Sequence, residues 1–179
     1  MFDRKSLIIL VIAIVAIISA WQYKSNQDEQ LRQKKLEIAE AKKIEQEKII
    51  ASENKLFMNL SLAIKNKNTQ AVMELLNKQI DINKHYKDGN TPLHLAAANK
   101  SYEIAYLLLK KGANIDAANE REQTALHIAT LSSADQVVFL LIREGANYKL
   151  VDNNSDRALD IAARNYDESL LKVLKYLEY

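Results

Sequence analysis

The sequence predicts an all-α protein with an N-terminal apolar helix, a charged helix and a helical repeat array. The 179-residue chain contains only 3 Gly and 1 Pro, too few for the many turns of an all-β domain. Residues 7–20 are almost entirely apolar, whereas residues 21–57 are mostly charged and polar. From Met58 onward, short motifs recur every 33 residues, a spacing within the range typical of helical repeat arrays.

The composition also excludes several classes of function. The chain has no Cys, so it has neither a disulfide framework nor a thiolate metal site, and either redox compartment is compatible with it. Its 25 Lys and Arg nearly balance 23 Asp and Glu. This near-neutral balance gives no reason to expect nucleic acid as a partner.

Residues 1–24 predict a transmembrane signal-anchor whose membrane contact is made by residues 6–23. These 18 residues carry no charge and would extend roughly 27 Å as a helix, close to the thickness of a thin bilayer core. Trp21 and Tyr23 stand where an aromatic belt would lie. Two alternatives are a signal peptide cleaved after Ile18-Ser19-Ala20 and a buried core helix.

The positive residues on the two sides of this segment do not settle its orientation. Arg4 and Lys5 precede it, but Lys24, Arg32, Lys34 and Lys35 follow it. A short basic N-terminus before an apolar run is typical of a signal-anchor, so we expect a single-pass protein of the cell inner membrane with a periplasmic C-terminal array. Secretion to the periplasm after cleavage and a cytoplasm-facing array are the alternatives.

Residues 25–57 predict a charged helical stalk. Residues 25–55 contain no Gly or Pro, and Asp28/Arg32 and Lys43/Glu47 are spaced for ion pairs along one helix. The apolar residues do not keep a heptad spacing, which argues against a stable coiled coil. We expect a solvated helix; weak self-association and docking onto the C-terminal array are the alternatives.

The C-terminal part of the chain consists of four similar segments. Thr91-Pro-Leu-His-Leu-Ala-Ala recurs as Thr124-Ala-Leu-His-Ile-Ala-Thr and as Arg157-Ala-Leu-Asp-Ile-Ala-Ala, each time 33 residues later. Gly112-Ala113-Asn114 recurs as Gly145-Ala146-Asn147, and Met58 begins an earlier, weaker copy. The repeats are residues 58–85, 86–118, 119–151 and 152–179.

These motifs resemble those of the ankyrin repeat family, whose pattern is close to D-x-x-G-x-T-P-L-H-L-A-A followed by L-L-x-x-G-A. The resemblance covers residues 58–179 and implies stacked helix pairs that complete one core together. Thr91 is placed to cap a helix that starts with Pro92, and Gly112 to end the next helix in a left-handed conformation. The resemblance also implies that His94 and His127 hydrogen-bond the turn.

The first and last repeats depart from the family pattern. The first lacks the Thr-Pro pair and the terminal Gly, and the fourth carries Arg157 and Asp160 in place of Thr and His, so both are interpreted as capping repeats. Glu122 and Ser155 replace the turn glycine Gly89. The glycine common between the two helices is replaced at four positions, so strained or remodelled tips are expected; the residues there are Lys67, Lys100, Ser133 and Tyr166.

The sequence offers no catalytic or metal-binding motif. His85, His94 and His127 are the only histidines, and their separation does not suit a three-histidine site. No phosphate-binding loop, zinc-protease motif or nucleophile elbow is present. We therefore predict a non-enzymatic protein without a cofactor, a metal or a small-molecule substrate.

The resemblance implies that another protein binds the concave face of the inner helices and the hairpin tips. The sign of the charge changes along the tips, from Lys84 and Lys87 to Asp152 and Asp156, so a partner with the complementary gradient would be oriented by it. Transferred to this chain, the binding positions are His85, Tyr86, Lys87, Asp88, Asn90, Ala98, Asn99, Glu120, Arg121, Gln123, Leu131, Ser132, Asn153, Asn154, Asp156, Arg164 and Asn165.

Met73, Tyr106 and Phe139 share one position of the second helix, which is usually polar in this family. They predict an apolar stripe on the convex side. The stripe is either half-buried between neighbouring helices or covered by the stalk or a partner.

Together these features predict a small bacterial, membrane-anchored interaction module. Some bacterial ankyrin proteins of this size resemble immunity proteins, inhibitors or chaperone-like partners of toxins and secreted enzymes, and this chain is interpreted in the same way. The alternative is a structural envelope tether without a dedicated tight partner.

Overall fold

The computed structural model describes residues 4–78, 80–165, 168 and 170–172. The chain divides into two compact parts, Met1–Ser52 and Glu53–Tyr179. All regular elements of the described residues are α-helices, and one isolated bridge joins Val151 to Arg157. The predicted all-α class is therefore confirmed.

Helix α1 (Arg4–Lys65) supplies the regular structure of the N-terminal part. The large apolar side chains between residues 7 and 18 are 47–68% exposed, so nothing in the described chain buries them. By length and composition α1 is the one described helix that could cross a membrane, with a mean hydropathy of 2.1 in its most apolar window. A signal sequence would meet the same criterion.

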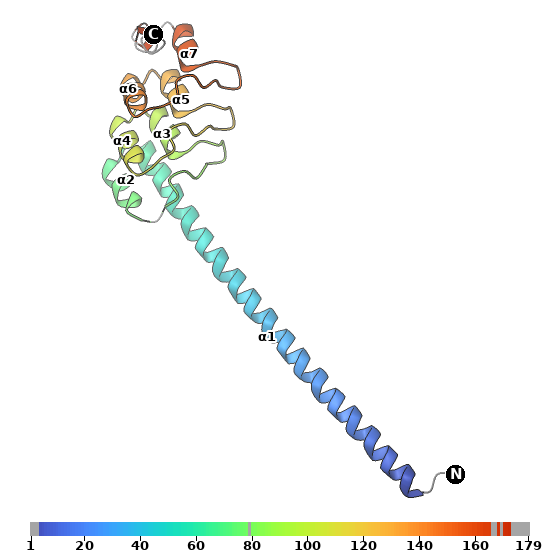
Figure 1. Ribbon diagram of the computed structural model, residues 1–179. Helices are drawn as coiled ribbons and strands as arrows, with labels where there is room; N and C mark the ends of the chain where they lie inside the picture. The colour runs from blue at the N-terminus through green and yellow to red at the C-terminus, as the bar shows by residue number, and fades with distance from the viewer. Residues whose placement is uncertain (1–3, 79, 166–167, 169, 173–179) are drawn as a thin grey trace. The chain divides into compact units, whose positions relative to one another are not determined.

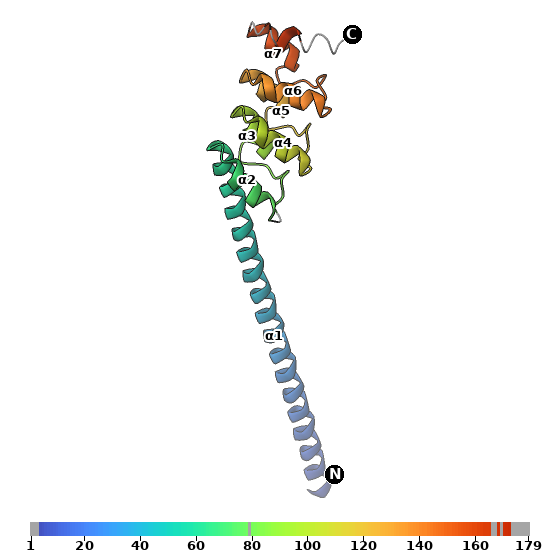
Figure 2. The same ribbon diagram turned by 90° about the vertical axis from the view of Figure 1, so that its left-hand side faces the viewer.

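The C-terminal part is a stack of helix pairs (Figures 1 and 2). One layer contains α3 (Pro92–Ala98), α5 (Ala125–Leu131) and α7 (Ala158–Arg164). The other contains α2 (Thr69–Leu76), α4 (Tyr102–Lys110) and α6 (Asp135–Arg143). Within the layers α5 packs against α3 and α7, and α4 packs against α2 and α6.

The same positions of successive repeats are buried. Leu60, Leu93 and Leu126 are at most 1% exposed and lie 33 residues apart. Ile104 and Val137 recur in the outer helices, and the buried Leu170 follows at the same spacing, so the fourth repeat continues the pattern. Each inner leucine thus fills the space between its own helix pair and the next one, which is how stacking completes the core.

The inner helices end in a left-handed residue without glycine. Lys67, Lys100 and Ser133 have φ values of +53°, +54° and +50°. The residues that follow them donate to carbonyls in the last turn, as in Ser101 N–H to Ala96 O at 3.0 Å. These residues therefore adopt the left-handed conformation that glycine has at this position in the family. The fourth such residue, Tyr166, lies outside the described residues.

The first repeat needs no helix cap of the kind formed by Thr91. Its inner helix is the end of α1, so the backbone N–H groups at that point are already bonded within the helix. Phe57, Leu60 and Ile64 of these last turns are buried in the C-terminal part. The physical reason for the missing Thr-Pro pair is this continuity of the helix.

Candidate protein-binding surface

Three hairpins project beyond the inner helices: hairpin 1 (residues 84–90), hairpin 2 (117–123) and hairpin 3 (150–156) (Figure 1). Two backbone bonds close hairpin 1, from Tyr86 N–H to Asn90 O at 2.8 Å and from Gly89 N–H to Tyr86 O at 3.0 Å. The equivalent bonds close hairpins 2 and 3. Gly89 has a φ of +73°, and Glu122 and Ser155 keep similar values of +58° and +64°. The tips are therefore not remodelled where glycine is missing.

Side-chain hubs hold hairpins 2 and 3. Asn119 Oδ1 accepts from the backbone N–H groups of Arg121 at 2.9 Å and Gln123 at 3.0 Å. Asp152 Oδ1 does the same for the backbone of hairpin 3, at 2.9 and 3.1 Å. Hairpin 1 differs, because the residue at this position is Tyr86 and cannot play this role.

Neighbouring hairpins are also joined to one another. Asn119 Nδ2 donates to Asn90 Oδ1 at 2.9 Å, and Gln123 Nε2 donates to Asp152 Oδ2 at 3.4 Å. Gln123 is only 7% exposed. This predicted binding residue is therefore buried, and its side chain links two hairpins.

His94 fastens hairpin 2, and His127 fastens hairpin 3, to the preceding inner helix. His94 Nδ1 accepts from the Thr91 backbone N–H at 3.1 Å, so its Nε2 carries the proton that is donated to Gln123 O at 2.8 Å. His127 makes the same bond with Thr124, and its Nε2 faces Leu150 O and Asp156 O, each at 3.1 Å. The turn-bonding role of both histidines is confirmed.

Burial lowers the pKa of both His94 and His127, although the carbonyls that they contact oppose this change. The neutral imidazole is therefore the form that fits the fold. In the fourth repeat Asp160 replaces the histidine: its carboxylate accepts from the Arg157 backbone N–H at 2.9 Å and pairs with the Arg157 side chain. The Arg157 side chain lowers the pKa of Asp160.

The predicted charge gradient along the tips is wrong at its acidic end. Asp152 is 3% exposed, and its carboxylate is occupied by the backbone of hairpin 3. Burial raises its pKa, but these backbone bonds outweigh that effect and lower it overall. Asp156 pairs with Arg164. The Asp152 carboxylate is thus buried and bound by its own hairpin, and Asp156 is paired, whereas Lys87 remains exposed at the other end.

The other predicted binding residues fall into two groups. Half-buried members include Asn99, whose side chain donates to Leu95 O at 2.9 Å, Asn90, whose side chain is tied to Asp88, and Ser132, whose backbone N–H caps α5. Tyr86 and Asp156 are half-buried. The exposed members of the set are His85, Lys87, Asp88, Ala98, Glu120, Arg121, Leu131, Asn153, Asn154, Arg164 and Asn165.

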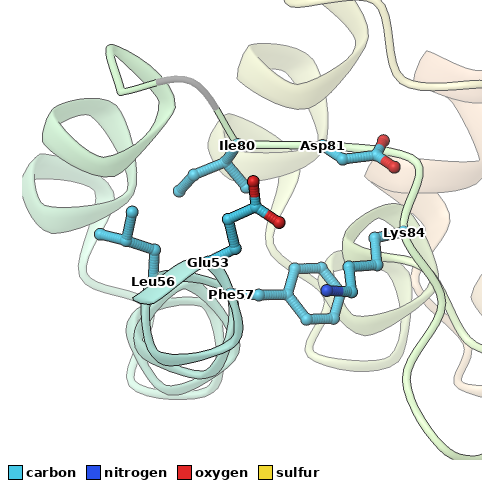
Figure 3. A pocket seen from close by; sticks show the side chains of 6 residues that line it. All are labelled: Glu53, Leu56, Phe57, Ile80, Asp81 and Lys84. Atoms are coloured by element: carbon cyan, nitrogen blue, oxygen red, sulfur yellow. The ribbon is translucent and has the colours of Figure 1, made fainter. Parts of the chain in front are cut away.

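Two hollows adjoin Phe57 near the start of the array. The first, of about 380 Å³, has Glu53 and Leu56 of α1 on one side and Ile80 and Asp81 on the other (Figure 3). Lys84 lies over the Phe57 ring, with Nζ 5.6 Å from its centroid. The second is a groove of about 500 Å³, here called the entry groove, lined by Asn54, Phe57, Met58, Ser61, Lys65, Lys84, His85, Tyr86, Lys87, Asp88 and Leu95.

Sequence reasoning missed the α1 side of the entry groove. Asn54, Met58 and Lys65 come from turns that were divided between the stalk and the first repeat. One feature of the sequence could have indicated this surface. Met58 and Leu62 are apolar but lie off the face of α1 that Leu60 and Ile64 bury. Both are well exposed, at 62% and 58%.

The convex stripe is exposed within the C-terminal part. Met73, Tyr106 and Phe139 are 41%, 38% and 49% exposed. Lys110 Nζ lies 5.2 Å from the centroid of the Tyr106 ring. Among the described residues, no cluster of three or more His, Asp or Glu side chains is arranged to hold a metal ion.

Comparison with known protein families agrees with this geometry. The family description for three copies of the ankyrin repeat matches residues 50–119, and that for a single ankyrin repeat matches residues 121–153. The chain belongs to the ankyrin repeat family. Ankyrin repeats form protein–protein interaction modules and are typically non-catalytic. No curated protein matches the sequence.

Proposed function

We propose that the protein is a single-pass anchor of the cell inner membrane that holds its ankyrin array in the periplasm to bind one partner protein. The exposed apolar segment between residues 7 and 18 supports the anchor, because such a surface is stable in lipid and costly in water. The basic residues Arg4 and Lys5 before it support a cytoplasmic N-terminus.

The observation that carries the binding role is the ladder of hairpins. Hydrogen bonds within and between hairpins fix their backbones, while Lys87, Glu120 and Asn153 stay exposed at equivalent positions. A surface that is ordered before binding loses little conformational entropy when a partner docks. This is the arrangement that an interaction module requires, and it suits an immunity protein, inhibitor or chaperone-like partner of a toxin or secreted enzyme.

Two measurements test this function. A reporter that is active only outside the cytoplasm, fused after Tyr179, should be active, and a reporter active only in the cytoplasm should not. Crosslinking in intact membranes followed by purification should yield one partner at a fixed stoichiometry. If the array yields no stoichiometric partner and the full chain is oligomeric, the structural tether explains the protein better.

A further inference from the structure

The entry groove differs from the rest of the hairpin surface in its charge. Lys65, Lys84 and Lys87 border it, and its one carboxylate, Asp88, accepts from the backbone and side chain of Asn90 at 3.2 and 2.6 Å. Lys84 is held in place, because its Nζ donates to Asn54 Oδ1 at 2.7 Å.

The later hairpins do not repeat these cations. Ala117 and Leu150 stand at the position of Lys84, and Glu120 and Asn153 at that of Lys87. The positive charge is therefore a property of hairpin 1 and not of the repeat.

The floor of the groove is also a departure from the repeat. Tyr86 occupies the position of the hubs Asn119 and Asp152, and its ring stacks on Phe57 with centroids 4.2 Å apart and planes at 21°. Met58, which is 62% exposed, and Leu95 extend this apolar surface. Hairpin 1 therefore has an aromatic residue of the groove floor at the position where hairpins 2 and 3 have a polar hub.

We infer that the entry groove binds an acidic segment of a partner protein that inserts an apolar side chain against Met58, Leu95 and the Phe57–Tyr86 stack. This inference rests on the proposed function and specifies its partner. The cations at the rim would pair with carboxylates, while the floor would desolvate the apolar side chain, which is the usual division between rim and core of an interface. A volume of about 500 Å³ is within the range of sites that enclose a ligand of a few side chains.

The probes are short synthetic peptides, and the protein is the full chain in lipid nanodiscs without anionic lipid. One peptide carries Leu flanked by Glu, a second carries Leu flanked by Lys, and a third carries Ser flanked by Glu. Fluorescence anisotropy should show binding of the first peptide alone, and added salt should weaken it.

Charge-removing variants test the rim. Lys65→Gln with Lys87→Gln should weaken binding of the Leu–Glu peptide on the order of tenfold, the effect of two partly exposed ion pairs. Lys78→Gln with Lys100→Gln removes the same charge from exposed positions that do not line the groove, and it should leave the affinity unchanged.

A matched pair of methionines tests the floor. Met58→Ser should weaken binding of the same peptide severalfold, whereas Met73→Ser on α2 should not. Both side chains are more than 40% exposed, so neither change removes much core packing.

The inference fails if the Leu–Lys peptide binds as well, if both double lysine variants weaken binding equally, or if none of the peptides binds. It also fails if vesicles of anionic lipid, and not the peptide, saturate the groove. A stoichiometric partner that crosslinks through another surface would leave the proposed function intact and overturn this inference alone.

Discussion

At the residue scale, hairpin 1 depends on one glycine for two separate reasons. Gly89 has a φ of +73°, and a Cβ added there would lie 2.5 Å from the backbone N of Glu120 in the next hairpin. Gly145 also has a positive φ, but nothing lies within 4 Å of its added Cβ. Replacing Gly145 therefore tests backbone strain alone, whereas replacing Gly89 tests backbone strain together with a steric clash.

Gly89→Ala should therefore destabilise the array more than Gly145→Ala. The second change should cost about 1 kcal/mol, the strain of an L-residue in the left-handed region. The first should cost at least about 1 kcal/mol more, because hairpins 1 and 2 must move apart. Urea denaturation of both variants measures the difference, and equal losses would contradict the close approach of these hairpins.

The buried hydroxyl of Tyr86 gives a second prediction. It makes no hydrogen bond of acceptable geometry, although the Ser61 hydroxyl lies near enough to oppose the rise in its pKa caused by burial. Tyr86→Phe should raise the free energy of unfolding by up to about 1 kcal/mol, because an unsatisfied polar group is removed.

Tyr102→Phe is the matched control, since the Tyr102 hydroxyl interacts with Arg143. That variant should be neutral or slightly less stable in thermal denaturation. A clear loss of stability in Tyr86→Phe would mean that Ser61 and Tyr86 do form a hydrogen bond.

At the scale of elements, the histidine clamps make the stability of the stack depend on pH. Burial lowers the folded-state pKa of His94 and His127 below the ordinary value of 6.5. The unfolded chain therefore binds more protons below about pH 6.5 than the folded chain does. The two neutral histidines therefore stabilise the folded chain above about pH 6.5, and this contribution is lost as the pH falls below it.

The urea midpoint of the full chain should thus decrease between pH 7 and pH 5. Replacing both histidines with Gln should lower stability at pH 7, because the bonds to the hairpins weaken, and should flatten the dependence on pH over this interval. A slope that is the same with and without the histidines would show that other groups cause it.

Sequence reasoning predicted the helix pairs well because their determinants are local. The Thr91-Pro92 start, the buried Leu93 and the turn at Gly112 each follow from a few neighbouring residues. It did not predict that Gln123 is buried or that the Asp152 carboxylate is buried and bound by its own hairpin. The burial of Gln123 depends on its contact with Asp152, 29 positions away in the next repeat, which no local pattern encodes. The bonds to Asp152 come from residues two and four positions later and depend on the backbone geometry of the turn.

The boundary between the stalk and the array was harder to place for the same reason. Residues 53–57 have the composition of the stalk, but Phe57 is buried and stacks on Tyr86, which is far away in sequence. One uninterrupted helix continues through both segments, so no helix end marks the change. Only tertiary contacts reveal where the array begins.

At the scale of the whole molecule, the exposed charged helix predicts a monomer. From residue 25 to residue 52 of α1 every side chain is exposed, and the sequence has no sustained heptad. Sedimentation of the full chain in detergent should give the mass of one chain with its detergent. A stable dimer that survives dilution would favour a structural tether.

Site-specific photocrosslinking in native membranes tests the central claim, that a partner protein docks on the entry groove. A photoreactive residue replaces Met58 in one variant and Tyr106, on the convex stripe, in the other. The account predicts one stoichiometric protein adduct from position 58, lost when Lys65 and Lys87 are changed to Gln, and no adduct from position 106. An adduct from position 106 alone, or no protein adduct from position 58, would contradict it.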